Sequence, residues 1–209
     1  MKILAVDTST HACSAALLLS NNIIQRFTVA AGQHTTFILP MINELLEEAN
    51  IDLQQLDAIA FGVGPGSFTG VRLAASIVQG LALANNTPII KISTLRALAQ
   101  EIFEKLGDTK LFIALDARME EVYWGEYQID SDGIMQAMTP DKLIKVECIK
   151  VDNAAKIYND IFIKDCDVNL QARTIAKIAA VDFAKGLVTT ADQALPVYLR
   201  EEIAWGVAK

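Results

Sequence analysis

Residues 62–76 read GVGPGSFTGVRLAAS, a segment with four glycines that passes directly into an apolar, helix-forming run. Glycine-rich loops at the start of a helix often bind phosphate. Neither common nucleotide signature is present, because the lysine of a P-loop and the third glycine of the G-x-G-x-x-G pattern are both missing. A second interpretation is that the glycines let two stretches of backbone approach closely where the helix begins.

The helix expected after this loop is apolar on almost every side. Between residues 71 and 84 its only polar side chains are Arg72, Ser76 and Gln79, and many of the others are small. Such a helix is buried on more than one side. One side would cover its own sheet. The other would meet a second protein or, as the simpler alternative, another part of the same domain.

The composition is that of an acidic globular protein. The chain has 209 residues, of which 52% are hydrophobic and 21% charged, and its net charge is −7. This length allows one large domain or two small ones. The negative charge argues against direct binding of a nucleic-acid backbone by this chain alone. The high apolar content suggests that another chain covers part of the surface.

Cysteine usage and the lack of long apolar runs predict a cytoplasmic location. Cys13, Cys148 and Cys166 are scattered and form no C-x-x-C pair, which is typical of a reducing compartment. Asp7 interrupts the N-terminal apolar run too early for a signal peptide. No unbroken apolar stretch reaches the roughly 18 residues that a membrane span needs, so we expect no membrane association.

Periodicity and turn residues predict alternating strands and helices. Asn21 and Asn22 read as the turn of a hairpin, and residues 116–119 as another turn. Pro40 fits a helix only in its first turn, where the missing N–H costs little. Residues 142–164 give no clear pattern. Strands are expected at residues 2–6, 12–20, 22–29, 58–63, 88–92, 111–115 and 121–129, and helices at residues 36–49, 69–84, 94–106 and 172–185.

A strand–turn–strand arrangement opens both halves of the chain, which predicts two related α/β lobes. Gly107 and Asp108 mark the boundary, so residues 1–106 would form an N-terminal, partner-binding lobe and residues 107–209 a C-terminal lobe. The tail at residues 196–205 is too apolar for a free end. We expect it to pack back on the first lobe.

Few side chains suggest chemistry. His11 and His34 could bind zinc, but neither has a carboxylate or thiol at ligand spacing, and His34 suits a polar loop or a helix cap. Asp7 and Asp116 each follow a strand, where sheet proteins place functional carboxylates; turn formation is the alternative. Cys13 reads as a packed strand thiol. The sequence offers no nucleophile–base pair and no basic patch.

Several segments resemble the bacterial TsaB (YeaZ) family of tRNA threonylcarbamoyladenosine biosynthesis proteins, along nearly the whole chain. They are AVDTST at 5–10, the His34 helix with Leu39 and Pro40, GPGSFTGVR at 64–72, ISTLRAL at 92–98, LDARMEEVYWG at 115–125 and PVYLREEIAW at 196–205. Residues 148–172 depart most from the family pattern. The resemblance implies an α/β fold of the two-lobed actin-like/Hsp70-like ATPase (ASKHA) type.

The same resemblance implies two protein partners. One is the paralogue TsaD, which transfers the threonylcarbamoyl group to N6 of adenosine 37 in tRNAs that read codons beginning with A. The other is TsaE, an ATPase that joins the pair.

Comparison with TsaD implies that the nucleotide and metal sites of the fold are degenerate here. Where TsaD has Asn-His-Leu-Glu-Gly-His with two metal-binding histidines, residues 93–98 read STLRAL, so Thr94 and Leu98 replace the imidazoles. Leucine cannot coordinate a cation. Where TsaD has a Ser-Gly-Gly-His phosphate loop, residues 115–118 read LDAR, whose side chains crowd and repel phosphate. The chain alone is expected to bind no cofactor, whereas the complex uses ATP, magnesium and a TsaD-bound metal.

The resemblance therefore implies a non-catalytic accessory subunit that binds and activates TsaD and helps to recruit TsaE, with tRNA contacted only through the complex. Without TsaD, like faces could pair as a homodimer. A stand-alone ATPase or peptidase-like enzyme of the same fold is the alternative. The partner interface is expected on two helices, at His34, Phe37, Ile38, Met41, Leu45, Phe68, Thr69, Arg72, Ala75, Ser76 and Gln79.

Overall fold

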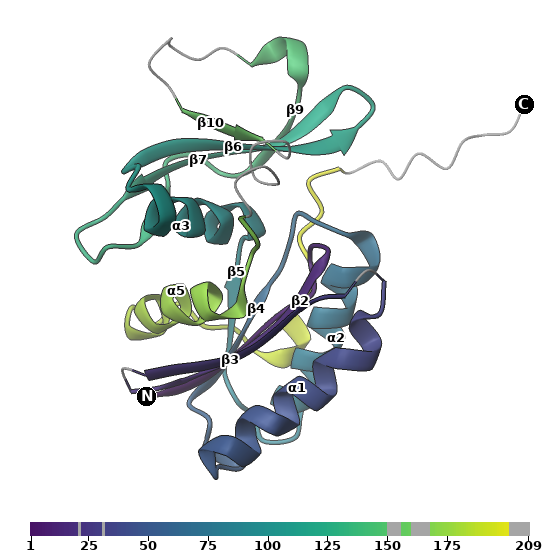
Figure 1. Cartoon of the computed structure of the whole chain (residues 1–209), viewed down its shortest axis with the longest axis vertical. Helices are drawn as coiled ribbons and strands as arrows, with labels where there is room; N and C mark the ends of the chain where they lie inside the picture. Colours follow the sequence, from purple (N-terminus) through teal and green to yellow (C-terminus); the bar gives the residue numbers. More distant parts are fainter. Residues whose placement is uncertain (21, 31, 150–155, 160–167, 201–209) are drawn as a thin grey trace, which may run out of the picture.

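The computed structural model describes residues 1–200 except 21, 31, 150–155 and 160–167, and it contains two sheets with helices packed on them (Figure 1). The first sheet has the strand order β3-β2-β1-β4-β5. Strands β1 to β3 form antiparallel pairs, so the predicted hairpin is confirmed, whereas β4 runs parallel to β1 and β5 parallel to β4. The strands are β1 (Lys2–Asp7), β2 (Ala12–Leu19), β3 (Asn22–Val29), β4 (Ala58–Gly62) and β5 (Ile89–Ile92).

The second sheet follows in the chain. Its order is β10-β6-β7-β8, and β9 pairs with β7. Strands β6 and β7 form an antiparallel hairpin, so both sheets begin with a strand–turn–strand unit. The strands are β6 (Lys110–Arg118), β7 (Glu121–Ile129), β8 (Met135–Ala137), β9 (Lys142–Lys145) and β10 (Ile157–Asn159).

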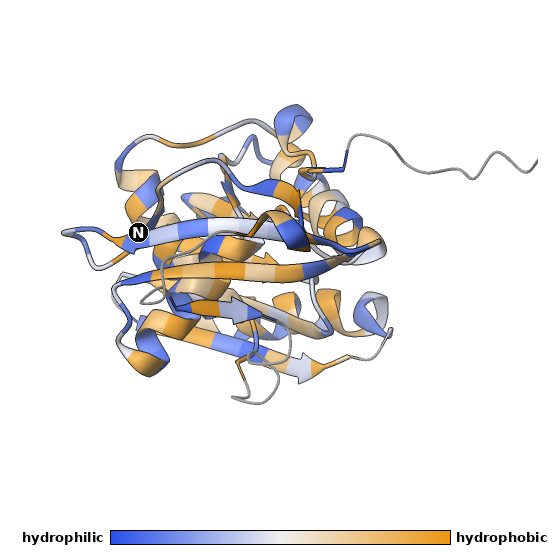
Figure 2. Ribbon diagram, turned by 90° about the horizontal axis from the view of Figure 1, so that it is seen from above, coloured by the Kyte–Doolittle hydropathy of each residue, from blue (hydrophilic) through white to orange (hydrophobic). Residues whose placement is uncertain are grey.

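Helices cover both faces of the first sheet. Helices α1 (His34–Ala49) and α2 (Phe68–Leu83) pack on one face, where β1 contributes Leu4 and Val6. Helix α5 (Ala172–Ala184) packs on the other face, where β1 contributes Ile3 and Ala5. Alternate residues of one strand therefore serve two cores. Figure 2, a view from above, shows orange along one strand in the middle of the molecule and white to blue along the strand beside it. Short 3-10 helices lie at η1 (Leu53–Gln55), η2 (Val146–Cys148) and η3 (Ala191–Gln193).

Helix α3 (Thr94–Leu106) lies between α5 and the second sheet (Figure 1). It precedes Gly107 but packs on the sheet that follows, against Leu111, Ile113 and Tyr127. Conversely, α5 follows Gly107 but packs on the first sheet. Each of these two helices therefore packs on the sheet that is formed by the other half of the chain. Together they form one apolar layer between the two sheets. The two sheets are formed by residues on either side of the predicted boundary at Gly107, but α3 and α5 each pack across it. The division into domains of residues 1–106 and 107–209 stays a prediction.

This architecture confirms the predicted fold class. Each sheet opens with an antiparallel hairpin, the parallel strands β4 and β5 extend the first sheet, and a helical layer lies between the sheets. The fold is the two-lobed α/β fold of the actin-like ATPases.

Two local predictions are wrong. Helix α1 begins at His34, so Pro40 lies in the second turn and not in the first. Its ring removes the hydrogen bond to the Thr36 carbonyl; both residues are exposed, so water can solvate that group. Strand β6 also continues further than expected, because its pairing with β7 extends to residue 118. The turn therefore falls at Met119 and Glu120, with φ of 58° and 59°.

The described part of the tail contacts the first sheet. The backbone N–H of Val197 donates to the carbonyl oxygen of Val63 at 2.9 Å, and Ala194 is buried in the core that α2 covers. Residues 201–205, the rest of the predicted docking segment, lie outside the described residues. Among the described helices, none is both long enough and apolar enough to span a membrane.

Candidate functional site

The glycine loop, residues 62–67, packs tightly against residues 8–11, which form the loop after β1. The backbone N–H of Ser67 donates to Ser9 O at 2.7 Å, and the Thr8 hydroxyl donates to Gly70 O at 2.7 Å. A Cβ atom on Gly66 would lie 2.5 Å from Ser9 O, and one on Gly70 would lie 1.9 Å from Thr8 O. The glycines therefore serve close backbone packing, which was the second interpretation of this stretch.

Three buried polar side chains lie beside this contact. Asp7, Ser9 and Thr94 are almost inaccessible to solvent. Ser9 donates its N–H and its hydroxyl to the Asp7 carboxyl at 3.3 and 2.8 Å, and the Thr94 hydroxyl donates to Ser9 Oγ at 3.3 Å. Burial raises the pKa of Asp7 to about 7, although the hydrogen bonds from Ser9 act in the opposite direction. Only glycine fits beside this carboxyl, since a Cβ on Gly62 would come 2.3 Å from Asp7 Oδ1.

This cluster does not have the arrangement of a nucleophile site. Ser9 is only 1% exposed, so a substrate carbonyl cannot reach its hydroxyl. That hydroxyl is already donated to Asp7, and no imidazole stands beside it to act as a base. Both histidines, His11 and His34, are bound elsewhere.

A cavity of about 820 Å³ lies between the two sheets. Its wall includes Thr94 and Leu98 of α3, the two residues predicted above to stand in place of the TsaD imidazoles. The glycine loop and the loop after β1 form one side, and β6 forms another. The remaining lining residues are Ser9, Thr10, His11, Pro65, Gly66, Ser67, Phe68, Leu115, Asp116, Ala117, Arg118, Tyr123, Val168, Asn169 and Leu170.

The residues of this cavity do not fit the nucleotide and metal of the fold family. Leu98 has no ligand atom, and the Thr94 hydroxyl is already bound to Ser9. The Ser67 N–H, which would face a phosphate at the start of α2, is donated to Ser9 O. Asp116 and Arg118 add a carboxylate and a guanidinium to the wall, and the two charges pair with each other at 3.5 Å.

Asp116 lies at the exposed end of the β6–β7 hairpin. Its Oδ1 accepts a hydrogen bond from the Arg118 N–H at 2.8 Å, and the two side chains form an ion pair at 3.5 Å. Arg118 has a φ of +67°, so this carboxylate stabilises a tight turn. The turn-forming alternative is therefore the one that the structure supports for Asp116.

The two histidines lie in separate contacts. His11 Nε2 contacts Asn169 Oδ1 at 2.8 Å, and His34 Nε2 contacts Thr10 O at 3.0 Å. No three potential ligand side chains in the described parts of the chain are grouped to hold a metal. His34 is the first residue of α1 and ties this helix to the loop after β1. Cys13 is packed in its strand, and burial raises the pKa of its thiol to about 11.

The predicted interface residues divide into two groups. Ile38, Met41, Leu45 and Ala75 are buried in the core of the isolated chain, and their place in a partner interface stays a prediction. Their helical spacing directs them toward the first sheet. For the others the prediction is also untested: Phe68, Thr69 and Ser76 are exposed, and His34, Phe37, Arg72 and Gln79 are partly exposed.

Sequence reasoning missed other exposed positions on the same helices. Leu39 is 53% exposed and Leu83 is 71% exposed. Gly80 is also exposed, with open space where a Cβ would lie. The helical period could have identified Leu39 as exposed. It follows the buried Ile38 and is therefore rotated by about 100° away from it around the helix axis. We call Leu39, Thr69, Ser76, Gly80 and Leu83 the outer helix face.

Comparisons with known proteins agree on one family. A family model described as "TsaD: tRNA N6-adenosine threonylcarbamoyltransferase" matches residues 18–208. The tRNA threonylcarbamoyladenosine biosynthesis protein TsaB of Escherichia coli (strain K12) is 38% identical over 98% of this chain and 97% of its own length. The protein of the same name from Haemophilus influenzae is 36% identical over 98% and 96%.

Solved structures give the same result. The structure titled "YeaZ from Pseudomonas aeruginosa" has a TM-score of 0.86 and 38% identity, and the match covers 95% of this chain and 99% of that one. The likeness thus extends over both sheets and over nearly the full length of the relatives. The chain belongs to the TsaB (YeaZ) family.

Proposed function

We propose that this chain is a non-catalytic accessory subunit in the synthesis of N6-threonylcarbamoyladenosine in tRNA, and that it binds and activates a TsaD transferase. The names of its relatives support a role in that pathway. The observation that carries the non-catalytic role is the wall of the inter-sheet cavity. There Thr94 and Leu98 offer no ligand set for a metal, and the Ser67 amide is donated to Ser9.

An inert subunit can control a rate through binding alone. If it binds one conformation of TsaD more tightly than another, it shifts the population toward that conformation. The outer helix face offers the surface for this binding. Leu39 and Leu83 supply exposed apolar area, and the small residues Ser76 and Gly80 would let a partner helix approach closely.

The other partners follow from the same proposal. TsaE would bind to the TsaD-containing complex, and tRNA would be contacted only through it, since a net charge of −7 disfavours direct binding. ATP, magnesium and the metal would be bound by the partner subunits. Without TsaD, the outer helix face could pair two copies of this chain.

Reconstitution tests the accessory role. TsaD, TsaE, threonylcarbamoyl-adenylate and tRNA are incubated with and without this chain, and modified adenosine is measured. We expect modification only when the chain is present. Equal modification without it would reject the proposal.

The docking surface is tested by a matched pair of variants. Ser76→Arg should abolish co-elution with TsaD in size-exclusion chromatography, because burying an unpaired guanidinium is costly. Ser131→Arg makes the same change at an exposed position in the β7–β8 turn and should leave the complex intact. Ala75 is unsuitable for this test because it is buried in the chain's own core. An intact complex with Ser76→Arg would reject this face as the docking surface.

Titration calorimetry tests the alternative of a stand-alone ATPase. The isolated chain is titrated with ATP and magnesium, and we expect no binding in the micromolar range. Micromolar binding would favour the ATPase over the accessory subunit.

A further inference from the structure

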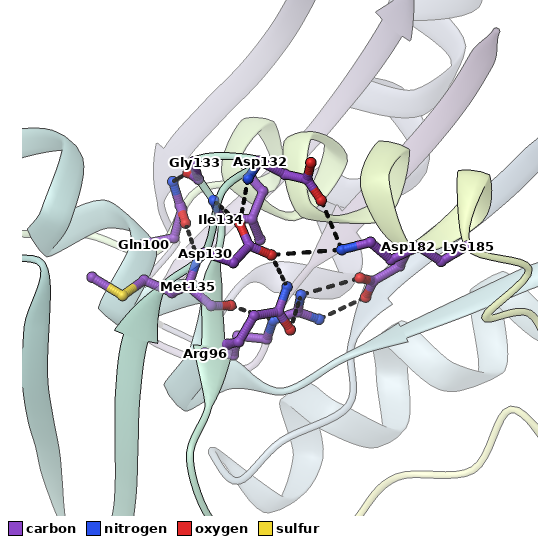
Figure 3. Close-up of polar contacts among 10 residues, drawn as sticks. Arg96, Gln100, Asp130, Asp132, Gly133, Ile134, Met135, Asp182 and Lys185 are labelled. Carbon is purple, nitrogen blue, oxygen red and sulfur yellow. Dashed lines mark hydrogen bonds and ion pairs between the residues drawn. The ribbon is translucent and has the colours of Figure 1, made fainter.

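Two sets of contacts join the two sheets beside the inter-sheet cavity. We call the first the clamp; it consists of Arg96 of α3, Asp182 and Lys185 at the C-terminal end of α5, and the β7–β8 turn (Figure 3). We call the second the strap; it consists of residues 197–200, which run from the end of β4 to the β6–β7 hairpin. In Figure 1, α3 and α5 lie on the left and the last described residues, in yellow, on the right.

The central Arg96–Asp182 pair of the clamp is buried, whereas its outer Lys185–Asp132 pair is 44% and 47% exposed. The guanidinium of Arg96 binds both carboxylate oxygens of Asp182 at 2.6 and 3.1 Å and donates to Met135 O at 2.7 Å. The Arg96 and Asp182 side chains are only 12% and 5% exposed. Lys185 adds an ion pair with Asp132 at 2.8 Å. Opening this side would leave buried charges without partners, which is strongly unfavourable.

The strap makes fewer contacts, and they are closer to water. At its start, Val197 N–H donates to Val63 O. At its end, one guanidinium nitrogen of Arg200 lies 2.6 Å from Glu121 Oε2 and 3.0 Å from Ala117 O. The Arg200 and Glu121 side chains are 26% and 21% exposed. An ion pair that is partly open to solvent is weaker and more sensitive to salt than a buried one, so the strap is the weaker side.

The strap lines a smaller space beside the inter-sheet cavity. A smaller cavity of about 370 Å³ is lined by strap residues, including Tyr198 and Arg200. Pro65, Phe68 and Tyr123 line both this smaller cavity and the inter-sheet cavity. The strap therefore lies beside the inter-sheet cavity, and through Arg200 it holds the β6–β7 hairpin, whose Ala117 and Tyr123 line that cavity.

Release of Arg200 has a further consequence for the hairpin. Glu121 Oε2 is buried, and within the described chain it has no hydrogen-bond partner apart from its ion-pair contact with Arg200. Without that contact, a carboxylate oxygen remains buried and unpaired, which is costly. Movement of the β6–β7 hairpin away from the strap would hydrate this oxygen. Loss of one contact thus favours movement of the hairpin, which forms one wall of the inter-sheet cavity.

We propose that the strap is a releasable closure over the inter-sheet cavity and that the clamp is the fixed side about which the cavity opens. Breaking the Arg200–Glu121 contact frees the β6–β7 hairpin, while the Arg96–Asp182 pair keeps α3 and α5 together. This device controls access to the cavity and does not depend on the proposed accessory role.

A thiol reporter in the cavity wall tests the proposal in the full-length chain. Cys148 and Cys166 are replaced by serine, and Leu98→Cys places a thiol at a position that lines the cavity and is 2% exposed in the native chain. Labelling by N-ethylmaleimide is then compared with and without Arg200→Gln. We expect labelling about tenfold faster with Arg200→Gln, the factor for loss of one charge-assisted hydrogen bond.

Arg26→Gln is the matched control. Arg26 also forms surface ion pairs, with Glu44 and Glu48, and its side chain is 34% exposed. It lies on β3, away from the cavity lining, so Arg26→Gln should leave the labelling rate unchanged. Equal rates for the parent and Arg200→Gln, or equal acceleration by Arg26→Gln, would overturn the proposal.

Hydrogen exchange gives a second readout that needs no reporter cysteine. In Arg200→Gln, amides of residues 116–122 should exchange about tenfold faster, while those of α3 and α5 keep their parent rates. Uniform acceleration across the chain would show general destabilisation and contradict a local closure. The double variant Arg200→Gln/Glu121→Gln should exchange more slowly than Arg200→Gln alone, because the buried charge is gone; an equal or faster rate would contradict the coupling through Glu121.

Discussion

The backbones of Thr8 and Gly70 are in direct contact. A Cβ on Gly70 would lie 1.9 Å from Thr8 O, and the Thr8 hydroxyl donates to Gly70 O at 2.7 Å. This contact joins the end of β1 to the first turn of α2, so the position of α2 depends on a residue without a side chain. Gly80, later on the same helix, has open space at its Cβ position. The two glycines therefore have opposite roles in one helix.

Substitution of these glycines by alanine should have opposite effects on stability. Gly70→Ala forces the two loops apart and should lower the free energy of unfolding by about 1–3 kcal/mol, the usual cost of overpacking. Gly80→Ala should raise it by about 0.5–1 kcal/mol, because alanine is the better helix former. Urea unfolding followed by circular dichroism measures both. Equal stability of the two variants would show that the loops can separate without cost.

Asp7 should make the protein less stable as pH rises through the weakly acidic range. The pKa of its buried carboxyl is raised from 3.8 to about 7. The folded state therefore holds this proton more tightly than the unfolded chain. Its contribution to stability is fully present below about pH 4, falls as pH rises from about 4 to 7, and is constant above that range.

Asp7→Asn isolates this contribution. The free energy of unfolding of the parent should fall relative to Asp7→Asn between about pH 4 and 7, by about 1.4 kcal/mol for each unit of pKa shift that is realised. Chemical denaturation at a series of pH values measures the difference. Glu147→Gln, which removes a carboxyl that is 77% exposed, should follow the parent curve. Parallel curves for the parent and Asp7→Asn would contradict a raised pKa at Asp7.

Element positions could be predicted from the sequence where the signals are local. The predicted helix at residues 94–106 has the observed bounds of α3. Ser93 Oγ accepts a hydrogen bond from Arg96 N at its start, and Gly107 adopts a left-handed φ of +79° at its end. Capping of this kind depends on neighbouring residues and is visible in the sequence. The glycines at residues 62–70 are also a local signal, and close backbone packing was one of the two interpretations that this signal allowed.

The rest depended on contacts between distant residues. Arg96 and Asp182 are 86 positions apart, and no local pattern pairs them. The exchange of α3 and α5 between the sheets also depends on long-range packing. Ile38 and Leu45, which were assigned to a partner interface, are buried against the chain's own sheet, because an apolar helix side can face a partner or its own sheet. Only the position of α1 against β2 decides between these alternatives.

Pro40→Ala should stabilise the chain. Pro40 is exposed in the second turn of α1, where its ring removes a helical hydrogen bond. Alanine restores that bond and should raise the free energy of unfolding by about 1–3 kcal/mol. Thermal unfolding measures the change as a higher Tm. Leu39→Ala, at the neighbouring exposed position, should change stability by less than about 0.5 kcal/mol. A lower Tm for Pro40→Ala would mean that the proline is needed for the shape of α1.

The buried pair in the clamp should show strong coupling between its partners. Asp182→Leu leaves the Arg96 guanidinium without its carboxylate in a site where the side chains are 12% and 5% exposed, and it should cost about 3–5 kcal/mol. Arg96→Met/Asp182→Leu removes both charges and should cost less than the two single variants together. Arg26→Met, which breaks exposed pairs with Glu44 and Glu48, should cost about 1 kcal/mol or less. Urea unfolding of the parent, Arg96→Met, Asp182→Leu and the double variant gives the coupling energy. Two outcomes would show that apolar packing, and not this ion pair, holds the two helices together. One is that the costs of Arg96→Met and Asp182→Leu are additive, and the other is that Asp182→Leu costs no more than Arg26→Met.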